Sequence, residues 1–130
     1  MSHLLKKSKS NFKVAEVTAS DAELCCASVH CSYYAYFQFA KHILSYELNP
    51  PKPLPKDEAH KFAFLWIHDA LGQLDPTQAH VFNSIWVPLH TCRLESDYDN
   101  IEISRTKAES ALSHAKRIIT ILSSTFAITW

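Results

Sequence analysis

Apolar residues recur every three or four positions along most of this 130-residue chain, which is the spacing of a helix that buries one face. The two clearest stripes run through residues 22–48 and 104–122. Their apolar members are Cys26, Val29, Tyr33, Phe37, Ala40, Leu44, Ala108, Ala111, Leu112, Ala115, Ile118, Ile119 and Leu122. A third run, 62–67, is apolar all round, which predicts a helix buried on most sides. A first helix is expected from about Leu4 to Ala19.

Capping residues and prolines set the expected boundaries in the first half of the chain. Ser20 or Asp21 can cap the second helix, because both side chains accept hydrogen bonds from free backbone N–H groups. The proline-rich stretch 49–55 cannot continue a helix and must end it. The third helix is expected to begin near Asp57 and to end near Gly72.

The second half carries similar signals. The pair 75–76 is an aspartate followed by proline, which predicts a helix start with the proline at the first helical position. This fourth helix is expected to run toward Arg93, and Pro88 should kink or divide it. A loop is expected at 95–100, after which Ser104 can cap the last helix.

Composition supports an all-α fold. The chain is 47% hydrophobic and 20% charged, which is typical of a globular protein rather than a disordered one. Gly72 is the only glycine, whereas sheet proteins use glycine in hairpins and tight turns. We therefore predict an antiparallel up-and-down bundle of four to five helices that forms a single domain over residues 1–130.

The charges balance at thirteen of each sign, so composition gives no support for a broad phosphate-binding platform. Their distribution is uneven. The charged side chains in question are Lys6, Lys7, Lys9 and Lys13 near the start of the chain, and Glu95, Asp97, Asp99 and Glu102 in a later segment. The basic and acidic groups can pair with each other, with a second copy of the chain or with a partner protein. Alternatively, they can form two separate faces that are simply exposed to solvent.

Cysteine and histidine usage predicts a cytoplasmic protein without a metal or cofactor. Four cysteines follow no secretory signal and are expected to be reduced. Cys26 with His30, and His60 with His68, have the spacing of ligands on one helix face, but neither pair has an evident third partner. The uncharged span 24–40 holds several polar side chains, so we interpret it as a core helix rather than a membrane helix.

Two segments carry a family resemblance. Residues 27–37 read Ala-Ser-Val-His-Cys-Ser-Tyr-Tyr-Ala-Tyr-Phe, with small residues before a Tyr-Tyr-Ala motif. Residues 89–99 read Leu-His-Thr-Cys-Arg-Leu-Glu-Ser-Asp-Tyr-Asp and precede the helix from Ser104. Together the two segments resemble the signature of HEPN domains (higher eukaryote and prokaryote nucleotide-binding). In order and spacing the resemblance covers about Leu4 to Leu122.

The resemblance implies a four-to-five-helix bundle that commonly dimerises. Many HEPN proteins are toxins of toxin–antitoxin pairs or defence components, often encoded beside a minimal nucleotidyltransferase. Some are metal-independent endoribonucleases, in which an arginine and a histidine four to six residues later converge from two subunits on the RNA backbone. The resemblance therefore predicts a homodimer, a nucleotidyltransferase-type partner, and RNA or a nucleotide as ligand.

The residues needed for RNA cleavage are only partly present. Arg93 can grip phosphate oxygens, but Tyr98, Asp99 and Asn100 occupy the positions of the family's histidine. None of these three side chains exchanges protons near neutral pH by default. His90, three residues before Arg93, is one replacement, because an imidazole ordinarily titrates near pH 6.5.

Asp97 is the other replacement, as a base whose pKa neighbouring carboxylates would raise. The catalytic candidates are thus Arg93, His90 and Asp97, and the binding candidates are Tyr98, Tyr34 and Glu95. Arg93 can instead be structural, paired with Asp97 or Asp99, and Tyr98 can simply pack on the last helix.

We expect the Arg93 segment to pack beside the helix that carries Tyr33 and Tyr34. Because these two tyrosines are adjacent, one should enter the core while the other lines a groove or a dimer interface. Three functions follow as hypotheses: an RNA- or nucleotide-associated module of a toxin–antitoxin or defence system, a metal-independent endoribonuclease, or a non-catalytic interaction scaffold. The sequence leaves enzymatic activity open.

Overall fold

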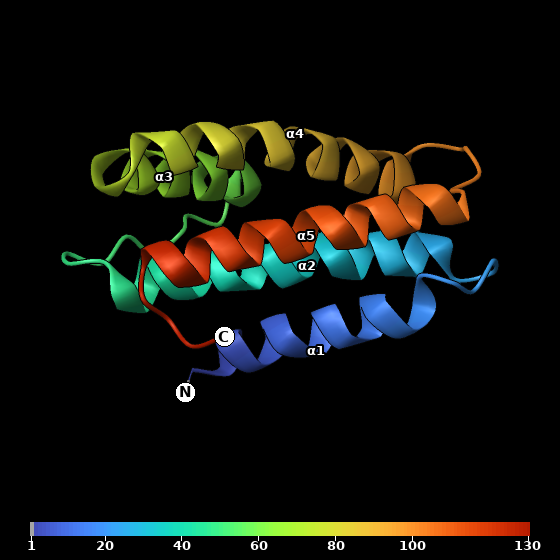
Figure 1. Ribbon diagram of the computed structural model, residues 1–130, viewed down its shortest axis with the longest axis horizontal. Helices are drawn as coiled ribbons and strands as arrows, with labels where there is room; N and C mark the ends of the chain where they lie inside the picture. The colour runs from blue at the N-terminus through green and yellow to red at the C-terminus, as the bar shows by residue number, and fades with distance from the viewer. Residues whose placement is uncertain (1) are drawn as a thin grey trace.

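The computed structural model describes residues 2–130, and in that range the chain is helical with no strand. Figure 1 shows the elements with their long axes roughly aligned. They are α1 (His3–Thr18), α2 (Cys25–His42), the π-helix η1 (Ile43–Glu47), α3 (Ala59–Leu74), α4 (Pro76–Tyr98) and α5 (Arg105–Thr125). The predicted all-α bundle is confirmed.

Helix α2 is the centre of the bundle, because it contacts all four of the other α-helices. Successive helices run in opposite directions, with one exception: the loop 48–58 carries the chain back, so that α3 runs in the same direction as α2 (Figure 1). This loop thereby brings the start of α3 beside the middle of α2, where the Tyr33 hydroxyl lies 2.9 Å from His60 Nδ1.

Small polar residues let α1 and α2 approach closely. Ser8 donates a hydrogen bond to the carbonyl of Ala35 at 2.6 Å, and Ser28 donates one to Ala15 at 2.9 Å. Both serines are fully buried, so these bonds prevent the cost of an unpaired hydroxyl in the core. The alternating small residues of the Tyr-Tyr-Ala segment thus have a packing role.

Two expected boundaries in α3 are wrong. The helix begins at Ala59 rather than near Asp57, and it continues through Gly72 to Leu74. Gly72 lacks a positive φ, and a Cβ built on it would lie at an ordinary contact distance of 3.9 Å from the Cβ of Ala79, so neither a turn nor a close approach requires glycine at this position. The expected cap at the next helix is confirmed, since Asp75 accepts a hydrogen bond from Gln78 N.

The expected loop at 95–100 and the division at Pro88 are also wrong. α4 is one helix that contains Pro88 and reaches Tyr98. Proline removes one intrahelical hydrogen bond, but the buried residues Ile85 and Leu89 on either side keep the helix packed on the core. Asp97, expected in the loop, is therefore held on the last turn of the helix. The Ser104 cap is confirmed, because its hydroxyl accepts from Lys107 N.

No helix within residues 2–130 combines the length and the apolar character needed to cross a lipid bilayer. The span 24–40 instead supplies much of the core. Its fully buried aromatic side chains are Tyr33, Tyr36 and Phe39.

Because the core depends on close packing, we expect the Ile67→Ala substitution to lower the free energy of unfolding by about 2–5 kcal/mol. Ile67 is fully buried, whereas Ile101 is 50% exposed and offers a matched control. Ile101→Ala should change stability by about 0.5 kcal/mol or less. Urea denaturation followed by circular dichroism measures both, and equal losses would contradict the packing described here.

Candidate functional site

Arg93 lies on α4 with its side chain turned into the surface between α4 and α2. Its side chain is only 8% exposed. Nε donates to Asp97 Oδ2 at 3.0 Å, and one terminal nitrogen, Nη2, donates to the hydroxyls of Tyr34 and Tyr98 at 3.2 Å each. The expected contact between the Arg93 segment and the Tyr-Tyr helix is therefore confirmed.

Three tyrosine rings surround this guanidinium. Its central carbon lies 5.2 Å from the ring centres of Tyr33 and Tyr98 and 5.7 Å from that of Tyr34. Distances of this size allow attraction between a cation and the faces of aromatic rings. Tyr33 is fully buried and Tyr34 partly buried, as expected for adjacent residues of a helix. The tyrosines and Asp97 together hold Arg93 in one position.

Asp97 links Arg93 to a histidine that the sequence did not single out for this site. The Nδ1 atom of His30 lies 3.0 Å and 3.1 Å from the two carboxylate oxygens of Asp97. His30 also packs on Tyr34, with 4.5 Å between ring centres. The carboxylate thus bridges a guanidinium and an imidazole. Both of its oxygens are engaged in these contacts, so neither is free to accept a proton as a general base.

Two further histidines lie near Arg93. The Nδ1 of His60 is 2.9 Å from the hydroxyl of Tyr33, and the ring stacks on Phe37 at 4.2 Å. His90 stacks on Trp86 at 4.5 Å, and its ring centre lies 5.9 Å from that of Tyr33.

Burial and the nearby guanidinium keep both rings uncharged. Burial, followed by the charges of Arg93 and His90, lowers the pKa of His60 to about 4. Burial and Arg93 also lower the pKa of His90. Burial raises the pKa of Tyr33, and the nearby Tyr34 raises it further, whereas the charge of Arg93 lowers it in part. At neutral pH the site therefore contains two uncharged imidazoles beside a permanent cation.

The remaining candidates, Glu95 and Tyr98, have different surroundings. Glu95 pairs with Lys107 of α5 rather than with Arg93. Tyr98 is 69% exposed, although its hydroxyl reaches the guanidinium. The structure thus brings together Arg93, Asp97, Tyr34 and Tyr98, with His90 close by, and leaves Glu95 in a separate contact.

We name the cluster of Arg93, Asp97, Tyr33, Tyr34, Tyr98, His30, His60 and His90 the arginine cluster. Neither His30 nor His60 was predicted from the sequence to belong to this cluster. A signal existed for His30, which lies four residues before Tyr34 and hence on the same helix face. No local signal existed for His60, since only the path of the loop 48–58 brings it to α2.

Metal binding has no support in the described part of the chain. Across residues 2–130, no group of three or more histidine, cysteine, aspartate or glutamate side chains is arranged to hold a metal ion. The cysteines in that range form no disulfide.

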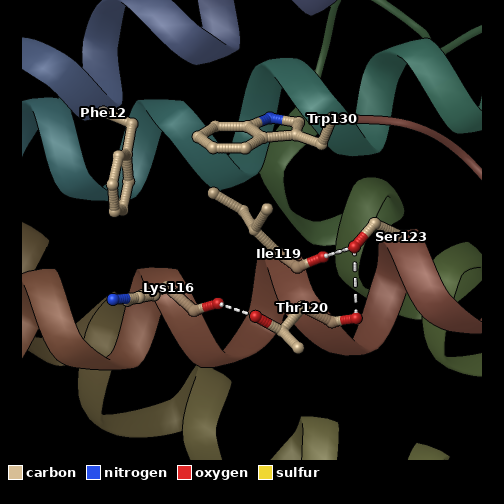
Figure 2. A pocket seen from close by; sticks show the side chains of 6 residues that line it. All are labelled: Phe12, Lys116, Ile119, Thr120, Ser123 and Trp130. Atoms are coloured by element: carbon tan, nitrogen blue, oxygen red, sulfur yellow. Dashed lines mark hydrogen bonds between the residues drawn. The ribbon is translucent and has the colours of Figure 1, made fainter.

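A separate hollow of about 270 Å³ lies between α1, α5 and the C-terminal residues (Figure 2). Its walls include Phe12 and Trp130, whose rings meet edge to face at 5.2 Å. The hydroxyls of Thr120 and Ser123 donate to carbonyls of their own helix, so their hydrogens are already engaged and only their oxygens can accept from a ligand. This hollow contains no member of the arginine cluster.

Chemically, the arginine cluster can bind an anion and accept a proton. Among residues 2–130, Nη1 of Arg93 has no hydrogen-bond partner, whereas Nε and Nη2 are engaged. A guanidinium fixed on one edge and open at the other can bind a phosphate oxygen. Comparison with known protein families, with curated proteins and with solved structures finds no match to this chain.

We expect the Asp97→Asn substitution to lower the free energy of unfolding by about 1–3 kcal/mol, because it weakens a charge-assisted hydrogen bond to a nearly buried cation. Asp99→Asn is the matched control, because Asp99 is exposed and forms no salt bridge with the described residues. Urea denaturation at neutral pH measures both. A loss in the control as large as that in Asp97→Asn would contradict the role given to the ion pair.

The pKa of His60 predicts a pH dependence of stability. Its folded-state pKa of about 4 lies below the ordinary value of 6.5, so the unfolded chain binds the proton more readily. The contribution of the neutral ring is fully present above about pH 6.5 and is lost as the pH falls toward 4.

Urea denaturation at several pH values should therefore show a smaller loss of stability in His60→Gln than in the wild type over this window. In a titration followed by NMR, the His60 ring should remain neutral until about pH 4. Substitution of His80, an exposed histidine elsewhere on α4, should leave the His60 titration unchanged. Protonation of His60 near pH 6.5 would contradict the burial described here.

Proposed function

We propose that this chain is a HEPN-like module that binds RNA or a nucleotide through the arginine cluster. One observation carries the proposal: a guanidinium is held in place by three tyrosines and a carboxylate, and one of its terminal nitrogens has no partner among residues 2–130. A preorganised cation of this kind suits a phosphate group, because little conformational entropy is lost on binding.

The exposed members of the cluster support a nucleic-acid ligand. Tyr98 is 69% exposed, and the side chain of His30 is 48% exposed. Aromatic rings beside a phosphate site can stack on bases, which is how proteins recognise unpaired nucleotides. In this role Arg93 holds the phosphate, Asp97 orients Arg93, and Tyr98 contacts the base.

Metal-independent endoribonuclease activity is the second candidate. The position of His90 beside Arg93 supports it, because an uncharged imidazole can accept the proton of a ribose hydroxyl, whereas the pKa of about 4 makes His60 a weak base. His90 follows the hypothesis drawn from the sequence, and His60 adds a second imidazole. Asp97 is less suited to this step, since both its oxygens are engaged.

The biological setting follows from the family resemblance alone. We propose that the chain acts in the cytoplasm as a homodimer, together with a nucleotidyltransferase-type partner, in a toxin–antitoxin or defence system. The unpaired cysteines are compatible with a reducing compartment.

Binding of labelled single-stranded RNA and of AMP, followed by fluorescence anisotropy at low salt, tests the proposal. We expect Arg93→Lys to weaken both by about tenfold or more, because lysine keeps the charge but lacks the planar donors. Affinity for RNA should fall steeply as salt rises. Lys6→Ala, on the exposed side of α1, is the control and should bind like the wild type. Absence of binding to either ligand would retire the proposal in favour of an interaction scaffold.

Incubation of the same RNA in excess chelator separates the two candidates. Cleavage that disappears in Arg93→Ala and weakens in His90→Gln or His60→Gln would establish an endoribonuclease. If the RNA is bound but stays intact, the result supports a binding module and contradicts the endoribonuclease.

A further inference from the structure

A groove of about 580 Å³ opens directly beside the arginine cluster. It runs between α2, the end of the loop 48–58 and the start of α3. Its lining residues include Tyr34, Phe37, Lys41, Lys56, Glu58 and His60. Tyr34 and His60 belong to the arginine cluster as well, so the groove and the cluster share a wall.

The groove has an excess of positive charge. Lys41 and Lys56 line it, and neither forms a salt bridge within residues 2–130. The one carboxylate in its wall, Glu58, lies 4.0 Å from Lys61, which partly compensates its charge. An anion in this groove therefore meets two available ammonium groups.

Aromatic rings accompany these cations. Phe37 and His60 stack on each other at 4.2 Å, and the ammonium of Lys41 lies 5.8 Å from the centre of the Phe37 ring. Phe37 is only 6% exposed, so it forms the floor beneath Lys41. Tyr34 stands at the boundary with the arginine cluster, where its hydroxyl accepts from Arg93.

His60 lies within electrostatic reach of both cationic regions. After burial, the charges of Arg93 and, more weakly, Lys41 both lower the pKa of this one ring. Because His60 lines the groove with Lys41 and also contacts Tyr33, whose ring borders Arg93, the two cationic regions adjoin at this ring.

We propose that the groove holds the phosphodiester next to the one at Arg93, with Lys41 as its principal contact. The ligand is then a single strand of at least two nucleotides, which enters along the loop 48–58, rather than a free mononucleotide. This inference rests on the proposed function of the arginine cluster. The groove volume is in the range of about 300–1,000 Å³ that small ligands occupy.

Lys41 is therefore a specificity residue for strand length. Each neutralised phosphate of a single strand contributes about 0.7 to the slope of log affinity against log salt. Loss of one such contact corresponds to about an eightfold weaker affinity at roughly 50 mM salt. A mononucleotide offers a single phosphate, which the proposal assigns to Arg93, so loss of Lys41 should leave its affinity unchanged.

Fluorescence anisotropy with a series of AMP and of 5′-phosphorylated diadenylate, tetra-adenylate and octa-adenylate, each labelled with fluorescein at its 3′ end, tests this inference, because the diadenylate is then the shortest member with two phosphates. The wild type should bind the diadenylate and the longer strands more tightly than AMP. Lys41→Ala should weaken binding of the strands by about eightfold and reduce their salt slope by about 0.7, while binding of AMP stays within about twofold. Lys41→Arg should restore most of the affinity, because it restores the charge.

Lys6→Ala serves as the matched control, since it removes one exposed lysine from α1 and should leave the whole series unchanged. Circular dichroism of each variant checks that the fold is retained. If the diadenylate binds no more tightly than AMP, or if Lys41→Ala behaves like Lys6→Ala, the inference is overturned, whereas binding of AMP that depends on Arg93 would still support the proposed function. If no member of the series binds, both fail together.

Discussion

A permanently charged guanidinium lies almost buried in the side of this bundle, and the surrounding structure must satisfy it. The side chain of Arg93 is 8% exposed and cannot lose its proton, so its charge must be compensated by a counter-charge and by hydrogen-bond acceptors within the protein. Asp97 supplies the counter-charge, while Tyr34 and Tyr98 supply hydroxyl acceptors. These contacts join α2 to α4 and extend α4 to Tyr98, so the site and the fold at this end of the molecule depend on one ion pair.

The same charge determines the chemistry of its neighbours. Arg93 adds to the effect of burial on His60 and His90, and both imidazoles are uncharged at neutral pH as a result. An anion bound at Arg93 would offset the positive field and make protonation of these rings easier. If an anion binds there as proposed, its binding would therefore be coupled to proton uptake by these rings.

The loop 48–58 has a larger role than that of a connection. It returns the chain along α2, so that α3 begins next to Tyr33 and Phe37 instead of at the far end of the bundle. His60 and Lys56 thereby come to lie beside Lys41, and a groove forms where an ordinary short turn would leave none. The proline-rich stretch that follows η1 therefore also contributes to the shape of the proposed second phosphate site.

The sequence by itself determined the helical class, the bundle and the stripes that form its core, because helix periodicity and caps such as Asp75 and Ser104 are local properties of the chain. It also predicted that Arg93 would meet the Tyr33–Tyr34 helix. Only the tertiary structure decided that α4 continues through Pro88, since packing of the flanking residues outweighs one lost hydrogen bond. Tertiary contacts also decided which histidines surround Arg93, because they depend on helix direction and register between segments distant in sequence, which no local pattern encodes.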